Sequence, residues 1–342
     1  MGAAPPSFEI EHRRAMRLAL GVTVTFTLTQ LHAWPLSFLA TVGTLVYLQD
    51  AKPMPVLEGI GTALKLFAAL AAGFVISVWL GDYPVVLVLT LVSLLALIYR
   101  YVLTRGGHLI VIVGLLLGGT LVPMLTTLLP ELGFVFIVYA GFSFVLAWFV
   151  SMVAFMLIPP PAEVPEAHHS DGFEDATPAA IQLAIVVGAI LTFFLMSGRT
   201  DALTLVYSAI FAMTLSTAGS ASMGLTYLRA NLFYAAVAVL IVFELLTVVP
   251  FLPFAVVLFF LVIYIFARGF FGHSPTAGEW SSGAFGFIII LSGMLSSEKI
   301  TASGKLFDRL VQIGTAAIFV TVAYALFEYF RQVHLNRANR HG

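Results

Sequence analysis

The chain has 342 residues, of which 60% are apolar and only 10% are charged, and its mean hydropathy is +1.03. A soluble domain carries about a quarter charged residues, so this composition requires lipid as part of the solvent. The net charge is −1 and Cys is absent, which argues against nucleic-acid binding and excludes disulfides, thiolate metal sites and a cysteine nucleophile.

The amino-terminal residues Met1 to Glu11 contain two prolines and two acids and no basic residue. They lack the layout of a cleaved signal peptide, so the first helix is expected to stay in the mature protein. A spanning helix needs about 20 mainly apolar residues. Pro, Gly and charged residues divide the chain into twelve such spans: 14–32, 35–49, 60–80, 84–101, 109–128, 134–158, 180–197, 202–217, 229–249, 251–268, 282–297 and 309–330.

These runs are continuously apolar and do not alternate between two faces, which favours helices over a closed barrel. The predicted fold class is an all-α polytopic membrane protein of about twelve transmembrane helices in two parallel six-helix repeats. The first repeat covers residues 1–158, and the second covers residues 179–342.

The segment 159–178 between the repeats begins with three prolines and contains five acids. A segment of this composition cannot bury enough apolar surface to order itself, so it is expected to be a flexible cytoplasmic linker. The adjacent His168 and His169 are a weak metal-binding pattern, and no metal or cofactor is expected.

Weak internal similarity supports the two repeats. The stretch Thr62-Ala-Leu-Lys-Leu-Phe67 aligns with Leu228-Arg-Ala-Asn-Leu-Phe233, and the glycines of Gly114-Leu-Leu-Leu-Gly-Gly119 have counterparts in Gly286 to Gly293. Glycines at 114, 118 and 119 also permit close helix packing. Six spans in each half give both halves one orientation, and sites in duplicated carriers commonly lie where the repeats meet.

Lys and Arg are retained on the cytoplasmic side of a membrane, so the loops predict the orientation. With a cytoplasmic amino terminus, 12 basic residues lie inside and 4 outside, which accounts for all 16. Both termini and the linker are therefore expected in the cytoplasm of a bacterial-type inner membrane. The outer set is Arg199, Lys299, Lys305 and Arg309.

The first three predicted spans contain short motifs: Arg13-Arg14-Ala-Met-Arg17-Leu-Ala-Leu-Gly21, the Trp34-Pro35-Leu-Ser-Phe-Leu that starts the second span, and Gly59-Ile-Gly-Thr62 with Gly73 in the third. These motifs resemble the fusaric-acid-resistance and aromatic-acid-exporter superfamily. The resemblance implies efflux of aromatic or other hydrophobic organic acids beside a periplasmic adaptor of the membrane-fusion type. The chain differs from larger members in its short linker and in having Ala179-Ala-Ile-Gln182 where an Arg would begin the second repeat.

Glu244 has no charged residue within a dozen positions on either side. An acid inside a span is costly in hydrocarbon, by about 2.5–3.5 kcal/mol, and commonly faces a cavity or a partner. Desolvation favours its neutral form, so Glu244 is a candidate for proton coupling. The alternative is a structural acid near the outer interface or bonded to a neighbouring helix.

Four basic residues are candidates for binding an anionic substrate. Lys65 and Arg229 begin the third and ninth spans and lie near each other in the alignment of the repeats, although such cations also snorkel and set topology, which is the slightly favoured interpretation. Arg14 and Arg17 are three positions apart and share a helical face. Anchoring to lipid head groups is the favoured interpretation for this pair, and the family resemblance adds a functional role as the second one.

No nucleotide-binding loop and no membrane-protease or hydrolase motif is present, so the chain is not expected to be an enzyme or to use ATP directly. The leading hypothesis is a proton-coupled exporter of aromatic or amphipathic organic acids, a class that extends to drugs. An anion channel is the first alternative, and a membrane-embedded enzyme or scaffold is the second. Membrane lipids, a small organic acid and a periplasmic adaptor are the expected partners, and a homo-oligomer is left open.

Overall fold

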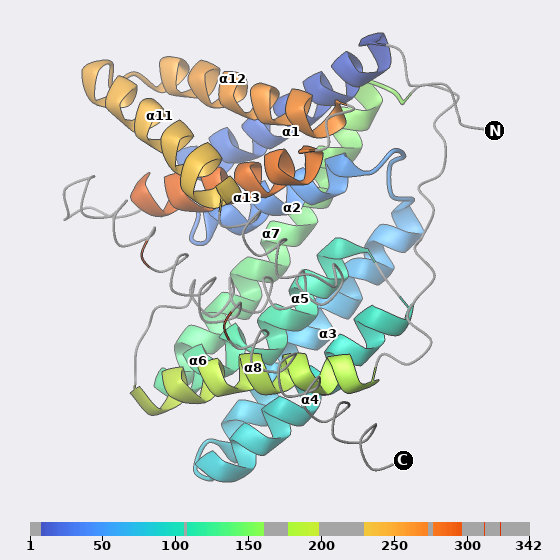
Figure 1. Ribbon diagram of the computed structural model, residues 1–342, viewed down its shortest axis with the longest axis vertical. Helices are drawn as coiled ribbons and strands as arrows, with labels where there is room; N and C mark the ends of the chain where they lie inside the picture. Colours follow the sequence, from blue (N-terminus) through green and yellow to red (C-terminus); the bar gives the residue numbers. More distant parts are fainter. Residues whose placement is uncertain are drawn as a thin grey trace, which may run out of the picture. The chain divides into compact units, whose positions relative to one another are not determined.

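The computed structural model describes residues 8–105, 108–160, 177–197, 229–272 and 276–295, together with Val311 and Val322. These residues form helices and no strand (Figure 1). The α-helices are α1 (Phe8–Leu31), α2 (Ser37–Gln49), α3 (Val56–Leu80), α4 (Pro84–Arg105), α5 (Leu109–Gly119), α6 (Leu121–Leu128), α7 (Pro130–Leu157), α8 (Thr177–Ser197), α11 (Ala236–Val248), α12 (Leu252–Phe271) and α13 (Ala277–Leu295). A π-helix, η1 (Ala230–Ala235), leads directly into α11.

Within these ranges, seven helical stretches are long and apolar enough to cross a membrane. One of them, Leu109–Leu128, combines α5 and α6, while α2 and the stretch Phe233–Val248 are shorter apolar helices. The chain is therefore a multi-pass helical membrane protein. The predicted spans 202–217 and 309–330 lie outside the described residues, apart from Val311 and Val322.

The fifth predicted span is interrupted. Helix α5 ends at Gly119 and α6 begins at Leu121, because Thr120 between them has φ −126° and ψ −65°. Pro123 lies in the first turn of α6, where its missing N–H does not matter, whereas in the interior of a continuous helix its ring would clash with the carbonyl of Gly119. The combination of two glycines followed by Pro123 therefore breaks this span into two helices.

The eleventh predicted span begins earlier than expected. The sequence placed its start at residue 282, but α13 begins at Ala277 and includes Glu279 and Trp280. The backbone N–H groups of both residues donate to the carbonyl of Thr276, which fixes the first turn. An acidic residue in the first turn is stabilised by the positive end of the helix dipole, which explains why the helix tolerates Glu279 there.

Contacts divide the chain into two compact units that do not coincide with the halves predicted from the sequence. Unit 1 consists of residues 1–65, 138–168 and 229–310, and unit 2 consists of residues 66–137, 169–228 and 311–342. Each unit combines segments from both sides of the linker, so the two repeats remain a prediction.

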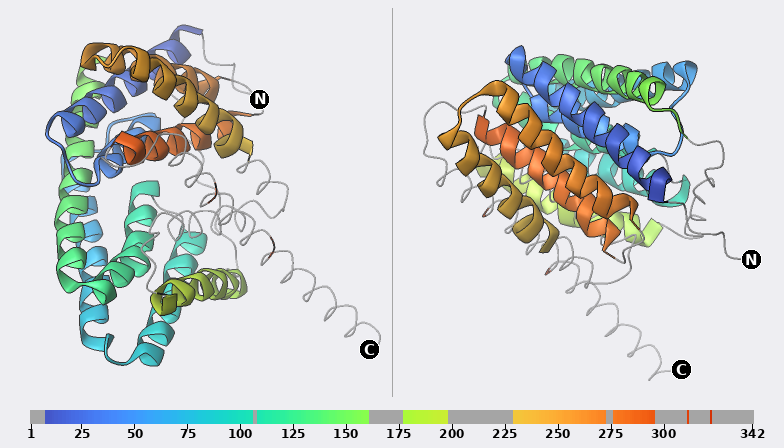
Figure 2. Two further views of the ribbon diagram at one scale, coloured as in Figure 1. Left: turned by 90° about the vertical axis from the view of Figure 1, so that its left-hand side faces the viewer. Right: turned by 90° about the horizontal axis from the view of Figure 1, so that it is seen from above.

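In unit 1, α1 packs against α2 and α12, and α13 packs against α2, α12 and η1; α1, α12 and α13 are seen side by side in Figure 2. Aromatic side chains form the contact between these helices. The rings of Phe26 and Phe259 stack 3.9 Å apart, and Phe287 lies 5.5 Å from Phe259 and 5.9 Å from Phe266. The buried Thr25 hydroxyl is satisfied locally, since it bonds the carbonyl of Gly21 and the hydroxyl of Thr44.

In unit 2, α4 packs against α8 and α5, as Figure 1 shows for α4 and α8. Glycines permit the closest approach, which confirms their predicted packing role. A Cβ on Gly73 of α3 would lie 1.9 Å from the carbonyl oxygen of Gly118 in α5, and one on Gly114 would lie 1.9 Å from a methyl of Leu66. Only a residue without a side chain allows these two backbones to lie so close.

Candidate functional site

Five helix ends of unit 1 meet at what we call the basic end. These are the beginnings of α1 and α13 and the ends of α2, α7 and α12. Side chains link them directly: Arg14 donates to the carbonyl of Gln49 at 3.3 Å, the Gln49 amide donates to Ser281 at 3.0 Å, and Arg17 donates to the carbonyl of Ile158 at 3.4 Å. The basic end therefore collects residues that are far apart in the sequence.

Arg17 is the most unusual residue of the basic end, because it is only 1% exposed. Its guanidinium carbon lies 4.0 Å from the centre of the Phe155 ring, and Nη1 donates to Ile158. The Nε and Nη2 groups are buried and have no hydrogen-bond partner. No carboxylate in the part of the chain that the structure describes neutralises it. A buried cation without an anion is strongly disfavoured, so Arg17 is not an ordinary structural residue.

The two unpaired groups of Arg17 have a specific arrangement. Nε–H and Nη2–H project from the same edge of the planar guanidinium, whereas Nη1, which is bonded to Ile158, lies on the other side. Two parallel N–H groups on one edge match the two oxygens of a carboxylate, which is the geometry of bidentate recognition. The unpaired edge of the Arg17 guanidinium is therefore chemically suited to an organic acid.

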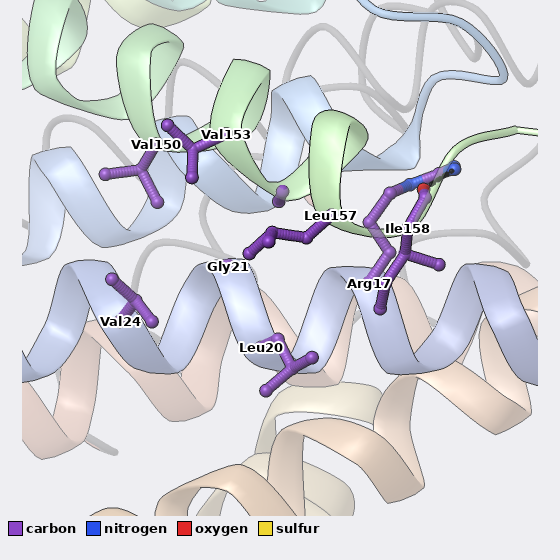
Figure 3. Close-up of a pocket in the computed structure, with 9 residues that line it drawn as sticks. Arg17, Leu20, Gly21, Val24, Val150, Val153, Leu157 and Ile158 are labelled. Atoms are coloured by element: carbon purple, nitrogen blue, oxygen red, sulfur yellow. Dashed lines mark hydrogen bonds between the residues drawn. The ribbon is translucent and has the colours of Figure 1, made fainter.

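A small cavity adjoins Arg17 between α1 and α7 (Figure 3). Its volume is about 50 Å³, and apart from Arg17 its lining is apolar: Leu20, Gly21, Val24, Val150, Val153, Ala154, Leu157 and Ile158. Gly21 lets the helices approach, since a Cβ there would lie 2.3 Å from Cδ1 of Leu48 and 3.3 Å from Cβ of Ala154. A single cation at the edge of an apolar cavity is an arrangement that binds an acid through its charge and its hydrocarbon body together.

Arg14 lies one turn before Arg17 and on the same side of α1, as the sequence spacing predicts. It is half-buried, and its guanidinium carbon lies 4.4 Å from the centre of the Phe271 ring. Its Nε is buried without a partner, while Nη2 donates to Gln49. Both arginines therefore pack into protein, so they do not reach outward as long cationic side chains that anchor to head groups do.

Arg229 belongs to the same end but is already paired. It precedes η1 and donates to Oε1 of Glu279, which is 5% exposed. The ring of Tyr234 in η1 lies 4.8 Å from that of Trp280 and holds η1 against α13. The sequence reading singled out Arg229 but missed Glu279. Glu279 and Arg229 are 50 positions apart, so no local pattern in the sequence pairs them. The one feature of the sequence that marks Glu279 is its place beside Trp280.

Lys65 and Glu244 lie elsewhere in unit 1. Lys65 is exposed on α3. Glu244 is on the exposed side of α11; its carbonyl accepts from the Thr247 hydroxyl, and its carboxylate has no partner in the described ranges. The protein does not enclose Glu244 there, so its proposed proton-coupling role stays a prediction that rests on the sequence.

No group of three or more His, Asp or Glu side chains that could hold a metal ion is found among the residues that the structure describes. His168 and His169 lie outside them.

The fold and the basic end define a multi-pass helical membrane protein with a buried cation beside an apolar cavity. Residues 14–156 match the model of a protein family of unknown function, DUF2955. The matched region begins at Arg14 and includes Arg17 and the α7 residues that line the cavity up to Ala154. Searches of curated proteins and of solved structures gave no match.

Proposed function

We propose that this protein is an inner-membrane exporter of aromatic or amphipathic organic acids. The observation that carries the proposal is the buried guanidinium of Arg17, whose Nε–H and Nη2–H groups are unpaired beside an apolar cavity. A structural arginine in a protein interior has its donors satisfied. An organic acid would satisfy both donors, neutralise the charge and place its hydrocarbon body against the valines and leucines of the cavity.

The proposal includes the arrangement predicted from the sequence: twelve spans in two parallel repeats, cytoplasmic termini and a periplasmic membrane-fusion adaptor. With this orientation, α1 begins in the cytoplasm, so the basic end faces the compartment from which an exporter takes its substrate. Export of the anion is coupled to entry of a proton, with Glu244 as the proton carrier. Lys65 and Arg229 then assist binding at the inner mouth, and Arg229 does so by exchanging its partner Glu279 for the substrate carboxylate.

Counterflow in proteoliposomes tests this function. Vesicles preloaded with unlabelled benzoate or decanoate should accumulate the same radiolabelled acid from outside if the protein carries it. The Arg17→Gln variant should lose accumulation by about tenfold or more, because a charge-assisted pair is removed. Arg13→Gln is the matched control, since Arg13 is on the same helix but exposed.

Three outcomes separate the hypotheses. Accumulation by the normal protein and by Arg13→Gln but not by Arg17→Gln supports a carrier with its anion site at Arg17. Rapid flux without counterflow indicates an anion channel. Equal accumulation by all three proteins contradicts the assigned site, and the absence of any flux of either acid contradicts the proposed function.

A further inference from the structure

The cavity beside Arg17 opens sideways. Four of its lining residues are exposed on the surface of unit 1: Leu20 is 38% exposed, Val24 46%, Val153 38% and Leu157 73%. Val153 and Leu157 belong to α7, which is long and apolar enough to cross a membrane, so the medium outside these two residues is hydrocarbon. The cavity is therefore reached from the bilayer past apolar side chains; Figure 3 shows Leu20, Val24 and Leu157 around it, with the nitrogens of Arg17 toward Ile158.

The apolar path continues along α1. Leu20 and Val24 also line a second, larger hollow of about 390 Å³ between α1 and α12, whose other lining residues are Thr23, Thr27, Leu28, Val256, Val257 and Phe260. From Arg17 to Leu28 the helix advances eleven residues, which is about 16 Å at 1.5 Å per residue. A cation at one end and an apolar track of this length form a site for a long, thin molecule with a charged head.

We propose that this α1 groove binds a fatty acid, taken up sideways from the cytoplasmic leaflet, with its carboxylate on Nε and Nη2 of Arg17 and its chain along Leu20 and Val24. This inference rests on the proposed function, because it assigns to the exporter a substrate class that is dissolved in the membrane. The carboxylate forms two parallel charge-assisted hydrogen bonds, which satisfy both unpaired donors. The acyl chain of the fatty acid replaces bilayer lipid against the exposed leucines and valines.

The size of the cavity selects a fatty acid over a phospholipid. A volume of about 50 Å³ holds roughly three or four water-sized groups, which a carboxylate and its first methylene carbons fill. A glycerophosphate head with two ester arms is several times larger and does not fit between α1 and α7. Phosphate also spreads its charge over a tetrahedron, whereas the unpaired edge of the Arg17 guanidinium is planar.

Photo-crosslinking of the full-length protein in nanodiscs tests the site. The probe is a palmitic acid that carries a diazirine on its chain, and the crosslinked residues are mapped by mass spectrometry. We expect labels on α1 and α7 residues of the groove. Arg17→Gln should reduce labelling about tenfold or more, while Arg13→Gln should not change it.

A second pair of variants tests the apolar track without touching the charge. Val153→Trp places a large ring at the mouth of the cavity, and because Val153 is exposed the core is not disturbed. Val145→Trp is the matched control, since Val145 is on the same helix, is 44% exposed and does not line the cavity. Labelling should fall in the first variant and persist in the second.

Competition on the unmodified protein gives the decisive comparison. Excess palmitate should abolish labelling, whereas palmitate methyl ester and phosphatidylglycerol should not. Equal competition by either of these would show ordinary lipid contact and overturn the inference. Labelling in a protein that transports no acid would leave the site standing and refute the proposed function. Transport of benzoate without labelling of the groove would refute the fatty-acid site and leave the proposed function standing.

Discussion

The guanidinium of Arg229 pairs with the carboxylate of Glu279, and the two side chains differ sharply in exposure, at 56% and 6%. The acid is therefore the buried partner, and its second oxygen, Oε2, is buried without a hydrogen bond. Removing a partner from such a pair leaves a charge that water cannot reach, which costs more than the pair itself contributes. The two residues should consequently respond very differently to substitution.

Arg229→Gln should lower the melting temperature of the detergent-purified protein more than Glu279→Gln does, because only the first change leaves a buried carboxylate unpaired. The expected loss for Arg229→Gln is about 1–3 kcal/mol. The double variant should recover part of that loss, since Gln at 279 carries no charge. If the two single losses simply add, Glu279 does not depend on Arg229.

Replacing Arg17 by Met should separate stability from function. The change removes a buried cation without a partner, and well-packed apolar replacements of buried charges are commonly neutral or stabilising. We expect an unchanged or higher melting temperature together with the loss of counterflow. Arg13→Met, at an exposed position, should leave both quantities unchanged. A marked fall in the melting temperature of Arg17→Met would instead give Arg17 a structural role.

Gly73→Ala and Gly61→Ala should have opposite effects, although both lie on α3. A Cβ on Gly73 would lie 1.9 Å from the carbonyl oxygen of Gly118, whereas nothing lies within 4 Å of one on Gly61. Forcing α3 and α5 apart should cost about 1–3 kcal/mol, while Ala at 61 should stabilise the helix by about 0.5–1 kcal/mol. Thermal unfolding of the two variants checks this, and equal melting temperatures would argue against close packing of α3 on α5.

Glu244→Gln should keep fold and expression, because the side chain is exposed and makes no hydrogen bond within the described ranges. If Glu244 carries the proton, export driven by a pH gradient should be lost while exchange of acid for acid continues. Glu58→Gln, another exposed acid, is the control. Gradient-driven export by Glu244→Gln at the normal rate would remove Glu244 from the mechanism.

Reporter fusions test the predicted orientation. With 12 of the 16 basic residues on the inner side, a fusion at Ser170 in the linker should report the cytoplasm, as should fusions at both termini. A fusion between Lys299 and Lys305 should report the periplasm. A periplasmic signal at Ser170 would exclude two parallel six-helix repeats.

The sequence alone determined that the protein is helical and crosses the membrane several times, and seven of its ten predicted spans in the described ranges correspond to helices long and apolar enough to cross a membrane. The reason is that hydrocarbon forces every backbone group to bond within its own helix, so long apolar runs permit little else. The same reasoning selected Arg14 and Arg17 by their spacing. It missed the break at Thr120, because the apolar run continues through it and only Gly119 and Pro123 mark the interruption.

The tertiary structure decided which cations are buried and what they contact. Lipid and protein interior are equally apolar, so the faces of a spanning helix carry no strong signal of which one packs inward. The contact of Arg17 with Ile158 joins residues 141 positions apart, and that of Arg229 with Glu279 joins residues 50 positions apart. Only packing of α1 against the end of α7 encloses Arg17 and leaves its Nε and Nη2 groups buried without a hydrogen-bond partner.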